Sequence, residues 1–155
     1  MKQRLDFLTT TPNVVKAMLG LHKPLSQSGL ENGLLDLVYF RVSQINGCAY
    51  CLDMHSKDLR AAGETEQRLY VLEAWRESPF YSERERAALA WAEAVTTLRD
   101  KDVPDDVYEQ ARAQFSEAEL VNLTLAVIAI NGWNRLNIAF RTTPGGYEVG
   151  MSFAA

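Results

Sequence analysis

Helix-start signals occur along the whole chain and restrict its fold more than any other feature. Ser82 with Glu85, and Ser116 with Glu119, each match the capping box, in which the serine and glutamate side chains satisfy backbone groups of a first helical turn. No segment shows a sustained alternation of apolar and polar residues that would indicate a strand. We therefore predict an all-α fold, with helices that begin one residue after each of these serines.

Proline, glycine and apolar spacing indicate where the other elements lie. Pro12 and Pro104 suit first helical turns. Segment 23–29 is typical of a linking loop, and residues 131–134 indicate a local irregularity in the last helix. The apolar tail 147–153 is expected to pack on another subunit. We expect helices over 12–20, 30–46, 48–62, 66–76, from 83 onward, a short one after 104, and 117–141.

Composition and charge limit the classes of partner. The chain has 155 residues, of which 47% are apolar and 23% are charged. It is long enough to bury a full hydrophobic core, so residues 1–155 are expected to form one domain. The formal net charge of −4 lacks the basic excess that binds phosphate backbones or anionic lipid surfaces. Neither nucleic acid nor a membrane is an expected partner.

The apolar segments of the chain do not resemble export or membrane signals. Residues 1–6 are followed, after only two apolar residues, by threonine and proline rather than by the apolar stretch of a secretory signal. The longest apolar run, 120–130, is interrupted by polar residues and is far shorter than a bilayer span. We therefore expect a cytoplasmic protein, where a close cysteine pair more often serves catalysis, redox sensing or metal binding than a permanent disulfide.

Cys48, Cys51 and His55 carry the clearest chemical signal. They comprise both cysteines and one of the two histidines, at spacings of three and four residues. If Cys48 opens a helix, the three side chains share one face, because positions three and four apart are neighbours on a helix. An attacking thiol, a partner thiol and a base would then lie together, which favours reversible thiol chemistry.

Other uses of this spacing fit less well. A c-type haem site requires histidine directly after the second cysteine, where this chain has Leu52. A zinc site would have three ligands and no second cluster, because His22 stands in a Leu-His-Lys-Pro segment and is expected to be a solvated loop residue. A structural disulfide over so short a loop would add only about 2 kcal/mol. Metal binding and two inert buried thiols stay open as alternatives.

Peroxide chemistry assigns roles to the three residues. Lowering a thiol pKa to about 6.5 gains only a few-fold in rate, since a more acidic thiol is a weaker nucleophile, so the site must also protonate the departing oxygen. His55 can take the thiol proton and pass it on. A helix N-terminus favours ionising Cys48, but the spacing brings His55 nearest Cys51. We choose Cys51 as the attacking thiol and Cys48 as the one that resolves the sulfenic acid into a disulfide.

Longer stretches of the chain resemble a known family. The matching segments are 35–38, 41–51, His55 and 130–137. They resemble the alkylhydroperoxidase D family of the carboxymuconolactone decarboxylase-like superfamily, over a core of about 14–141 that leaves 142–155 as a tail. The resemblance implies an all-helical subunit of a homo-oligomer, a trimer or a hexamer, with peroxidase activity at the Cys-x-x-Cys.

The family pattern also implies roles for single residues. Its second cysteine attacks the peroxide, its first resolves, and a histidine relays protons with an upstream glutamate. These positions fall on Cys51, Cys48 and His55, and the glutamate falls on Asp36, a shorter acid. The alternative for Asp36 is a solvated acid on a helix margin. Residues 133–134, Trp and Asn, are candidate donors near the thiols, with packing and capping as the alternative.

The sequence thus predicts a thiol-dependent peroxidase or disulfide reductase that acts on organic hydroperoxides. It needs no metal and no tightly bound cofactor, but an external dithiol, such as lipoamide or a small redox protein, must reopen the disulfide. One rival is a redox-sensing homo-oligomer without significant turnover. Another is a carboxymuconolactone decarboxylase-type enzyme, which the superfamily alone implies.

Overall fold

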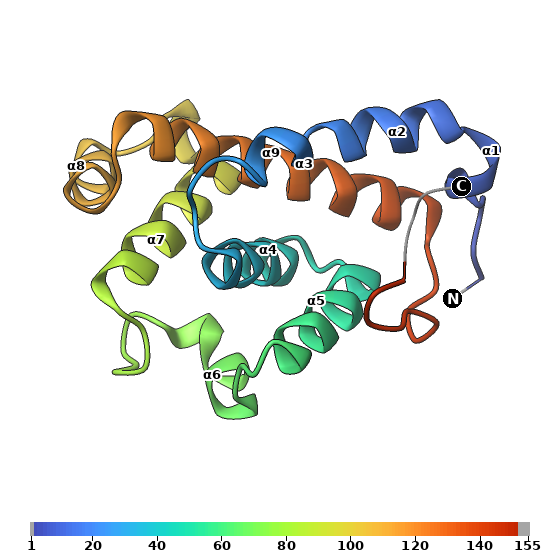
Figure 1. Ribbon diagram of the computed structural model, residues 1–155, viewed down its shortest axis with the longest axis horizontal. Coiled ribbons are helices and arrows are strands. Elements are labelled where there is room, and N and C mark those ends of the chain that lie inside the picture. The colour runs from blue at the N-terminus through green and yellow to red at the C-terminus, as the bar shows by residue number, and fades with distance from the viewer. Residues whose placement is uncertain (1, 152–155) are drawn as a thin grey trace.

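The computed structural model describes residues 2–151, and this part of the chain consists of helices and the turns between them (Figure 1). The expected all-α fold is confirmed. The helices are α1 (Phe7–Thr10), α2 (Pro12–Gly20), α3 (His22–Leu25), α4 (Asn32–Asn46), α5 (Ala49–Ala61), α6 (Glu66–Tyr70), α7 (Glu83–Thr97), α8 (Asp105–Gln114) and α9 (Glu117–Phe140), with short 3₁₀ turns at Leu72–Ala74 and Arg99–Lys101.

Both predicted capping boxes are present. The hydroxyl of Ser82 accepts the backbone N–H of Glu85, whose carboxylate accepts the backbone N–H of Ser82 in return, and α7 begins there. Ser116 and Glu119 make the same pair of bonds at the start of α9. The two helix starts are therefore where local hydrogen bonding places them.

The connections differ from the prediction in two places. The stretch predicted as one helix over 66–76 is split into α6 and the 3₁₀ turn at Leu72–Ala74. The loop predicted at 23–29 contains most of α3, whose Leu25 is buried. The split occurs at Val71, whose φ of −98° and ψ of 7° depart from α-helical values. The helix α3 forms because a helical turn that buries a leucine is more stable than its loop-forming residues alone suggest.

Helix α9 is continuous, so the irregularity predicted at 131–134 was wrong. The side chain of Asn131 donates to the carbonyl of Val127 one turn earlier, and Gly132 keeps helical geometry. Among residues 2–151 no single helix has the length and apolar content to cross a membrane, although α8 and α9, bent by 117°, pass that test as a pair.

Helix α4 lies at the centre of the molecule and packs against α5, α7 and α9 (Figure 1). Eight of its side chains are buried, on nearly all of its faces. One core cluster lies between α4, α7, α8 and α9, and includes Val38, Trp91 and Leu123. A second lies between α4, α5, α7 and the α6 region, and includes Leu37 and Leu59. The end of α4 is thus held rigidly where the chain turns into α5.

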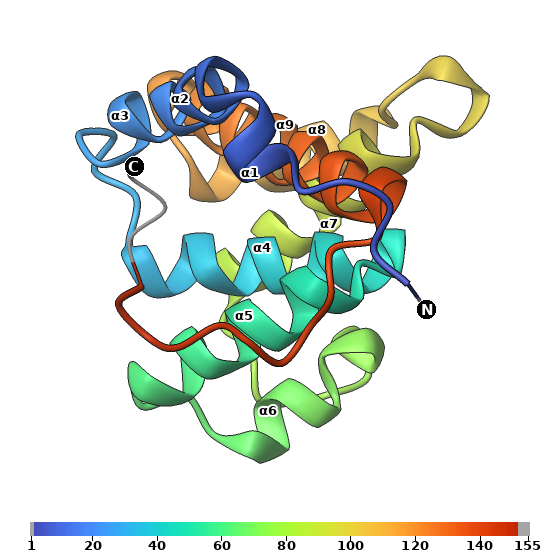
Figure 2. The ribbon, with the colours of Figure 1, turned by 90° about the vertical axis from the view of Figure 1, so that its right-hand side faces the viewer.

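The chain after α9 returns across α5 (Figure 2). Asp53 accepts the backbone N–H of Gly145 at 2.9 Å, Lys57 donates to the carbonyl of Tyr147 at 2.9 Å, and the Tyr147 hydroxyl donates to Asp58 at 2.7 Å. Polar side chains on α5 therefore hold Tyr147, the first residue of the predicted tail, within the chain. Val149 and Met151 are exposed, and the packing of this tail on another subunit stays a prediction. The end of the predicted tail, 152–153, lies outside the described residues.

Candidate active site

The turn between α4 and α5 places both cysteines. Gly47 ends α4 with φ = 68°, a left-handed conformation that glycine adopts without steric cost. Cys48 follows as the N-cap of α5, and its Sγ accepts the backbone N–H of Cys51 at 3.4 Å. The cysteines therefore occupy a helix N-terminus, where backbone N–H groups favour a thiolate.

Cys48 and Cys51 form a disulfide in this structure. Their Cα atoms are 5.3 Å apart, within the usual range for such a bond, and each residue is 1% exposed. The structure therefore describes the oxidised state of the pair that sequence analysis predicted.

His55 lies one turn after Cys51 on α5 and is 7% exposed. Burial lowers its pKa to about 4, with a smaller contribution from nearby His22. Among the described residues its Nε2 has no hydrogen-bond partner, and its ring centroid is 5.5 Å from that of Tyr39. At neutral pH His55 is an uncharged imidazole that can accept a proton.

An apolar pocket of about 190 Å³ opens beside the disulfide. Cys51 and His55 contribute to its wall, whereas Cys48 is not among the lining residues of the described chain. The pocket joins the N-terminal helices to α4, α5 and α9. Its remaining lining residues are Phe7, Leu8, Leu19, His22, Tyr39, Tyr50, Met54, Ile130, Trp133 and Asn137. A small organic molecule in this space would lie against Cys51.

His22 is part of this wall, so its prediction as a solvated loop residue was wrong. It lies in α3, and its Nε2 accepts a hydrogen bond from the indole N–H of Trp133 at 3.1 Å. Burial lowers its pKa. The N-terminal helices reach this position because α2 packs closely on α9, where a Cβ at Gly132 would lie 2.7 Å from the Met18 side chain.

Of the donors considered in α9, Trp133 lines the pocket but Asn134 does not. Asn134 is fully buried and instead donates to the Ser43 hydroxyl at 3.0 Å, an interaction that joins α9 to α4. The α9 side chain that donates to a cysteine sulfur is instead Asn137, whose Nδ2 is 3.5 Å from Cys51 Sγ. Sequence reasoning missed this role, although Asn137 follows Trp133 at the helical spacing of four that places both on one face.

Asp36 is half-buried on α4, one turn before Tyr39. Burial, and next the negative charge of Asp58, raise the pKa of its carboxyl to about 6. Within residues 2–151 no hydrogen bond joins Asp36 to His55. The structure therefore brings Cys48, Cys51 and His55 together, whereas Asp36 is not among the described residues that line the pocket, and a relay through Asp36 stays a prediction.

The described part of the chain holds no group of three His, Cys, Asp or Glu side chains arranged to bind a metal ion. The candidate site thus consists of the two cysteines, the His55 imidazole and the apolar pocket wall.

Comparisons with known proteins agree with this geometry. Residues 12–94 match the model of the carboxymuconolactone decarboxylase family. The uncharacterised protein YdfG of Bacillus subtilis is 44% identical over 139 residues, 90% of this chain and 95% of that protein. The alkyl hydroperoxide reductase AhpD of Mycobacteroides abscessus is 44% identical over 50 residues, 32% of this chain and 27% of that protein.

Among solved structures, ATU0492 of Agrobacterium tumefaciens superposes with a TM-score of 0.89 at 42% identity, over 94% of this chain and 100% of that chain. ATU0492 is described as a protein of unknown function and, provisionally, as the antioxidant defence protein AhpD. The resemblance read from the motifs is confirmed. The chain belongs to the carboxymuconolactone decarboxylase family, and within it to the AhpD-like proteins.

Proposed function

We propose that this protein is a thiol-dependent peroxidase that reduces organic hydroperoxides. The observation that carries the proposal is the position of Cys51, which is disulfide-bonded to Cys48 and lines an apolar pocket beside an uncharged histidine. The AhpD-like relatives support the same reaction class.

In the first step the Cys51 thiolate attacks the terminal oxygen of the hydroperoxide. A sulfur–oxygen bond forms, the oxygen–oxygen bond breaks, and the sulfur gives two electrons to the peroxide. His55, which has taken the thiol proton, returns it to the departing alkoxide and an alcohol leaves. Because burial lowers the pKa of His55, its imidazole is uncharged at rest and carries the proton only during the transfer, so it releases that proton readily to the alkoxide.

In the second step the Cys48 thiolate attacks the Cys51 sulfenic acid. The sulfur–sulfur bond forms, the sulfur–oxygen bond breaks, and the departing hydroxide takes a proton to become water. The product is the disulfide that the structure describes. An external dithiol then reduces it through a mixed disulfide, so each cycle consumes one hydroperoxide and one dithiol.

The surroundings of the disulfide suggest its reaction partners. The apolar wall favours an organic rather than an inorganic peroxide. Both cysteines are buried, so a slender dithiol such as lipoamide would reach them through the pocket more readily than a redox protein. We place this cycle in the cytoplasm and in a homo-oligomer, a trimer or a hexamer, with no resident cofactor.

The test is hydroperoxide consumption by the fully reduced protein, with free thiols counted before and after and a dithiol then added. The proposal expects loss of two thiols per hydroperoxide, followed by repeated turnover. Loss of thiols without turnover on any dithiol would instead favour the redox-sensing oligomer. Intact thiols after exposure to hydroperoxide would contradict the proposal, and a carboxylated lactone should then be tried as substrate for the decarboxylase rival.

A further inference from the structure

We propose that Asn137 is a further catalytic residue, whose side-chain amide donates a hydrogen bond to the sulfur of Cys51 and stabilises its thiolate. The inference deepens the proposed function and rests on it for the kinetic consequence, whereas the state of the thiol can be measured without a peroxide.

The amide of Asn137 is oriented by its own helix. Its Nδ2 donates to the backbone carbonyl of Trp133 at 3.0 Å and also lies 3.5 Å from Cys51 Sγ. A carbonyl oxygen can only accept, so this bond identifies the nitrogen side of the amide. One N–H of the amide is used by the carbonyl, and the second faces the sulfur. Asn137 is 6% exposed, so water has little access to compete for either hydrogen.

Hydrogen bonds one turn earlier on α9 fix the position of Asn137 relative to Cys51. Asn134 donates to Ser43 at 3.0 Å and accepts from Asn46 at 2.8 Å, and both partners lie at the end of α4. The chain then turns through Gly47 into the cysteine helix. The buried amides thus hold the end of α4 and the middle of α9 in one register, which places the Asn137 amide opposite the sulfur.

The pocket offers the Cys51 sulfur little other stabilisation. The titratable side chains that line it with Cys51 are two histidines from α3 and α5 and two tyrosines from α4 and α5. Burial lowers the pKa of His22 and His55 and raises the pKa of Tyr39 and Tyr50, so all four are uncharged at neutral pH. An anion in such surroundings requires hydrogen-bond donors, because burial alone disfavours its charge.

The amide also distinguishes the two cysteines. The sulfur of Cys48 accepts a backbone N–H at the start of α5, so the helix by itself favours a thiolate there. Asn137 supplies a side-chain donor to Cys51 instead. The donor from α9 therefore shifts ionisation toward the sulfur that lines the substrate pocket.

The experiment measures the pKa of the Cys51 thiol in a Cys48→Ser background, from the pH dependence of alkylation by iodoacetamide. Asn137→Leu, which keeps the branched shape of the side chain and removes the donor, should raise that pKa by about one unit, a ten-fold lower thiolate fraction at neutral pH. Asn137→Asp, which is isosteric and cannot donate when ionised, should raise it further. With both cysteines present, Asn137→Leu should slow hydroperoxide reduction only about three-fold, since a more basic thiolate is a better nucleophile.

Thr124→Val is the matched control, because it removes a polar group of α9 that accepts the indole N–H of Trp91 and lies outside the pocket. It should destabilise the protein and leave the thiol pKa unchanged. The proposal is overturned if folded Asn137→Leu and Asn137→Asp, checked by circular dichroism, both titrate like their parent, or if Thr124→Val shifts the pKa equally. If the parent protein consumes no hydroperoxide while the pKa still depends on Asn137, the proposed peroxidase fails and the assignment of the donor stands.

Discussion

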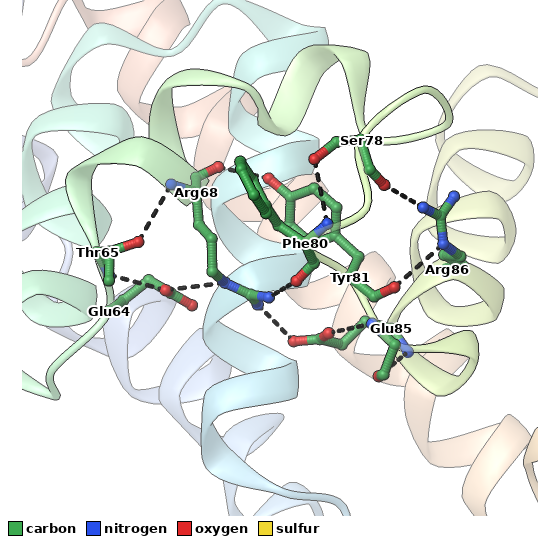
Figure 3. Close-up of polar contacts among 9 residues, drawn as sticks. Glu64, Thr65, Arg68, Ser78, Phe80, Tyr81, Glu85 and Arg86 are labelled. Carbon is green, nitrogen blue, oxygen red and sulfur yellow. Dashed lines mark hydrogen bonds and ion pairs between the residues drawn. The ribbon is translucent and has the colours of Figure 1, made fainter.

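The pocket beside Cys51 and the charged surface between α6 and α7 differ in whether their polar side chains have hydrogen-bond and ion-pair partners. On that surface Arg68 forms ion pairs with Glu64 and Glu85, donates to the carbonyl of Phe80, and stacks over the ring of Tyr81 (Figure 3). We call these five residues the Arg68 cluster. Its arginine, although only partly exposed, has partners on several sides.

In the pocket, burial is not compensated in this way. His55 has no partner for Nε2 among the described residues. On α4, outside the pocket lining, the half-buried Asp36 has another acid, Asp58, as its electrostatic neighbour. Buried polar groups without partners reduce folding stability. The Arg68 cluster therefore serves stability, whereas His55 and Asp36 are buried at a cost to stability that a role in the chemistry explains.

The strongest test of this comparison is removal of the attacking sulfur. Cys51→Ser should reduce hydroperoxide consumption to background, because a serine hydroxyl at its ordinary pKa is not a comparable nucleophile. Cys48→Ser should still complete one reduction and retain a sulfenic acid, which dimedone labelling followed by mass spectrometry detects. Full turnover by Cys51→Ser, or a sulfenic acid on Cys48, would reverse the roles.

Replacement of His55 should separate activity from stability. His55→Leu should slow hydroperoxide reduction about a hundred-fold, because the proton carrier is lost, and His55→Gln should raise the thiol pKa. The unfolded histidine binds a proton below about pH 6.5 and the folded one only below about 4, so folding stability decreases as pH falls through this window.

His55→Leu should abolish that loss of stability, which amounts to about 3 kcal/mol at its full extent. Urea unfolding of parent and variant at several pH values measures it. If no other group has an opposing pH dependence, a parent protein whose stability is constant between pH 6.5 and 4 would contradict the conclusion that His55 is a buried neutral imidazole. Asp36 is such an opposing group, so the comparison is best made in an Asp36→Asn background.

Asp36→Asn should have a smaller effect on rate and a clear effect on stability. If Asp36 passes protons to the His55 site, hydroperoxide reduction should fall about ten-fold. Its folded pKa of about 6 lies above the unfolded value of 3.8, so its contribution to stability is lost as pH rises through this window. The variant should therefore be more stable by about 2 kcal/mol at pH 7, by urea unfolding. If Asp36→Asn increases stability and leaves the rate unchanged, Asp36 is a buried acid that takes no part in the proton relay.

Disruption of the Arg68 cluster should produce the reverse pattern. Arg68→Met should lower the free energy of unfolding by about 2 kcal/mol, because it leaves two carboxylates without their shared partner, and it should not change the peroxidase rate. Arg76→Met is the control, since Arg76 is 59% exposed in its ion pair with Glu93 and should matter by less than about 1 kcal/mol. Chemical denaturation measures the free energy of unfolding, and peroxide assays on the same preparations measure the rate. A slower Arg68→Met enzyme would link this surface to the pocket.

Local sequence was a good guide wherever a contact lies within one turn. The capping boxes at Ser82 and Ser116, the turn at Gly47 and the shared face of Cys51 and His55 are all set by neighbours three or four residues apart. Such contacts depend on helix geometry alone and are therefore readable without a fold.

The errors and omissions concern contacts between distant segments. His22 forms its hydrogen bond with Trp133, and Tyr147 binds Asp58 and Lys57 on α5. Local composition at 22–29 and 147–153 is typical of loops, and no local pattern identifies a partner about ninety or more residues away. Asn137 was missed for the same reason, since its sulfur partner belongs to another helix.

The sequence alone thus determined the helical class, the turn after which a helix begins at Cys48, and the alignment of two thiols with a histidine. Helix periodicity and capping are short-range, so they need no knowledge of the packing. Tertiary structure decided which sulfur faces the pocket, that His55 is uncharged, and that Asn137 meets Cys51. Burial and contacts between helices arise only when α4, α5 and α9 pack together, and the pKa values of the site follow from that packing.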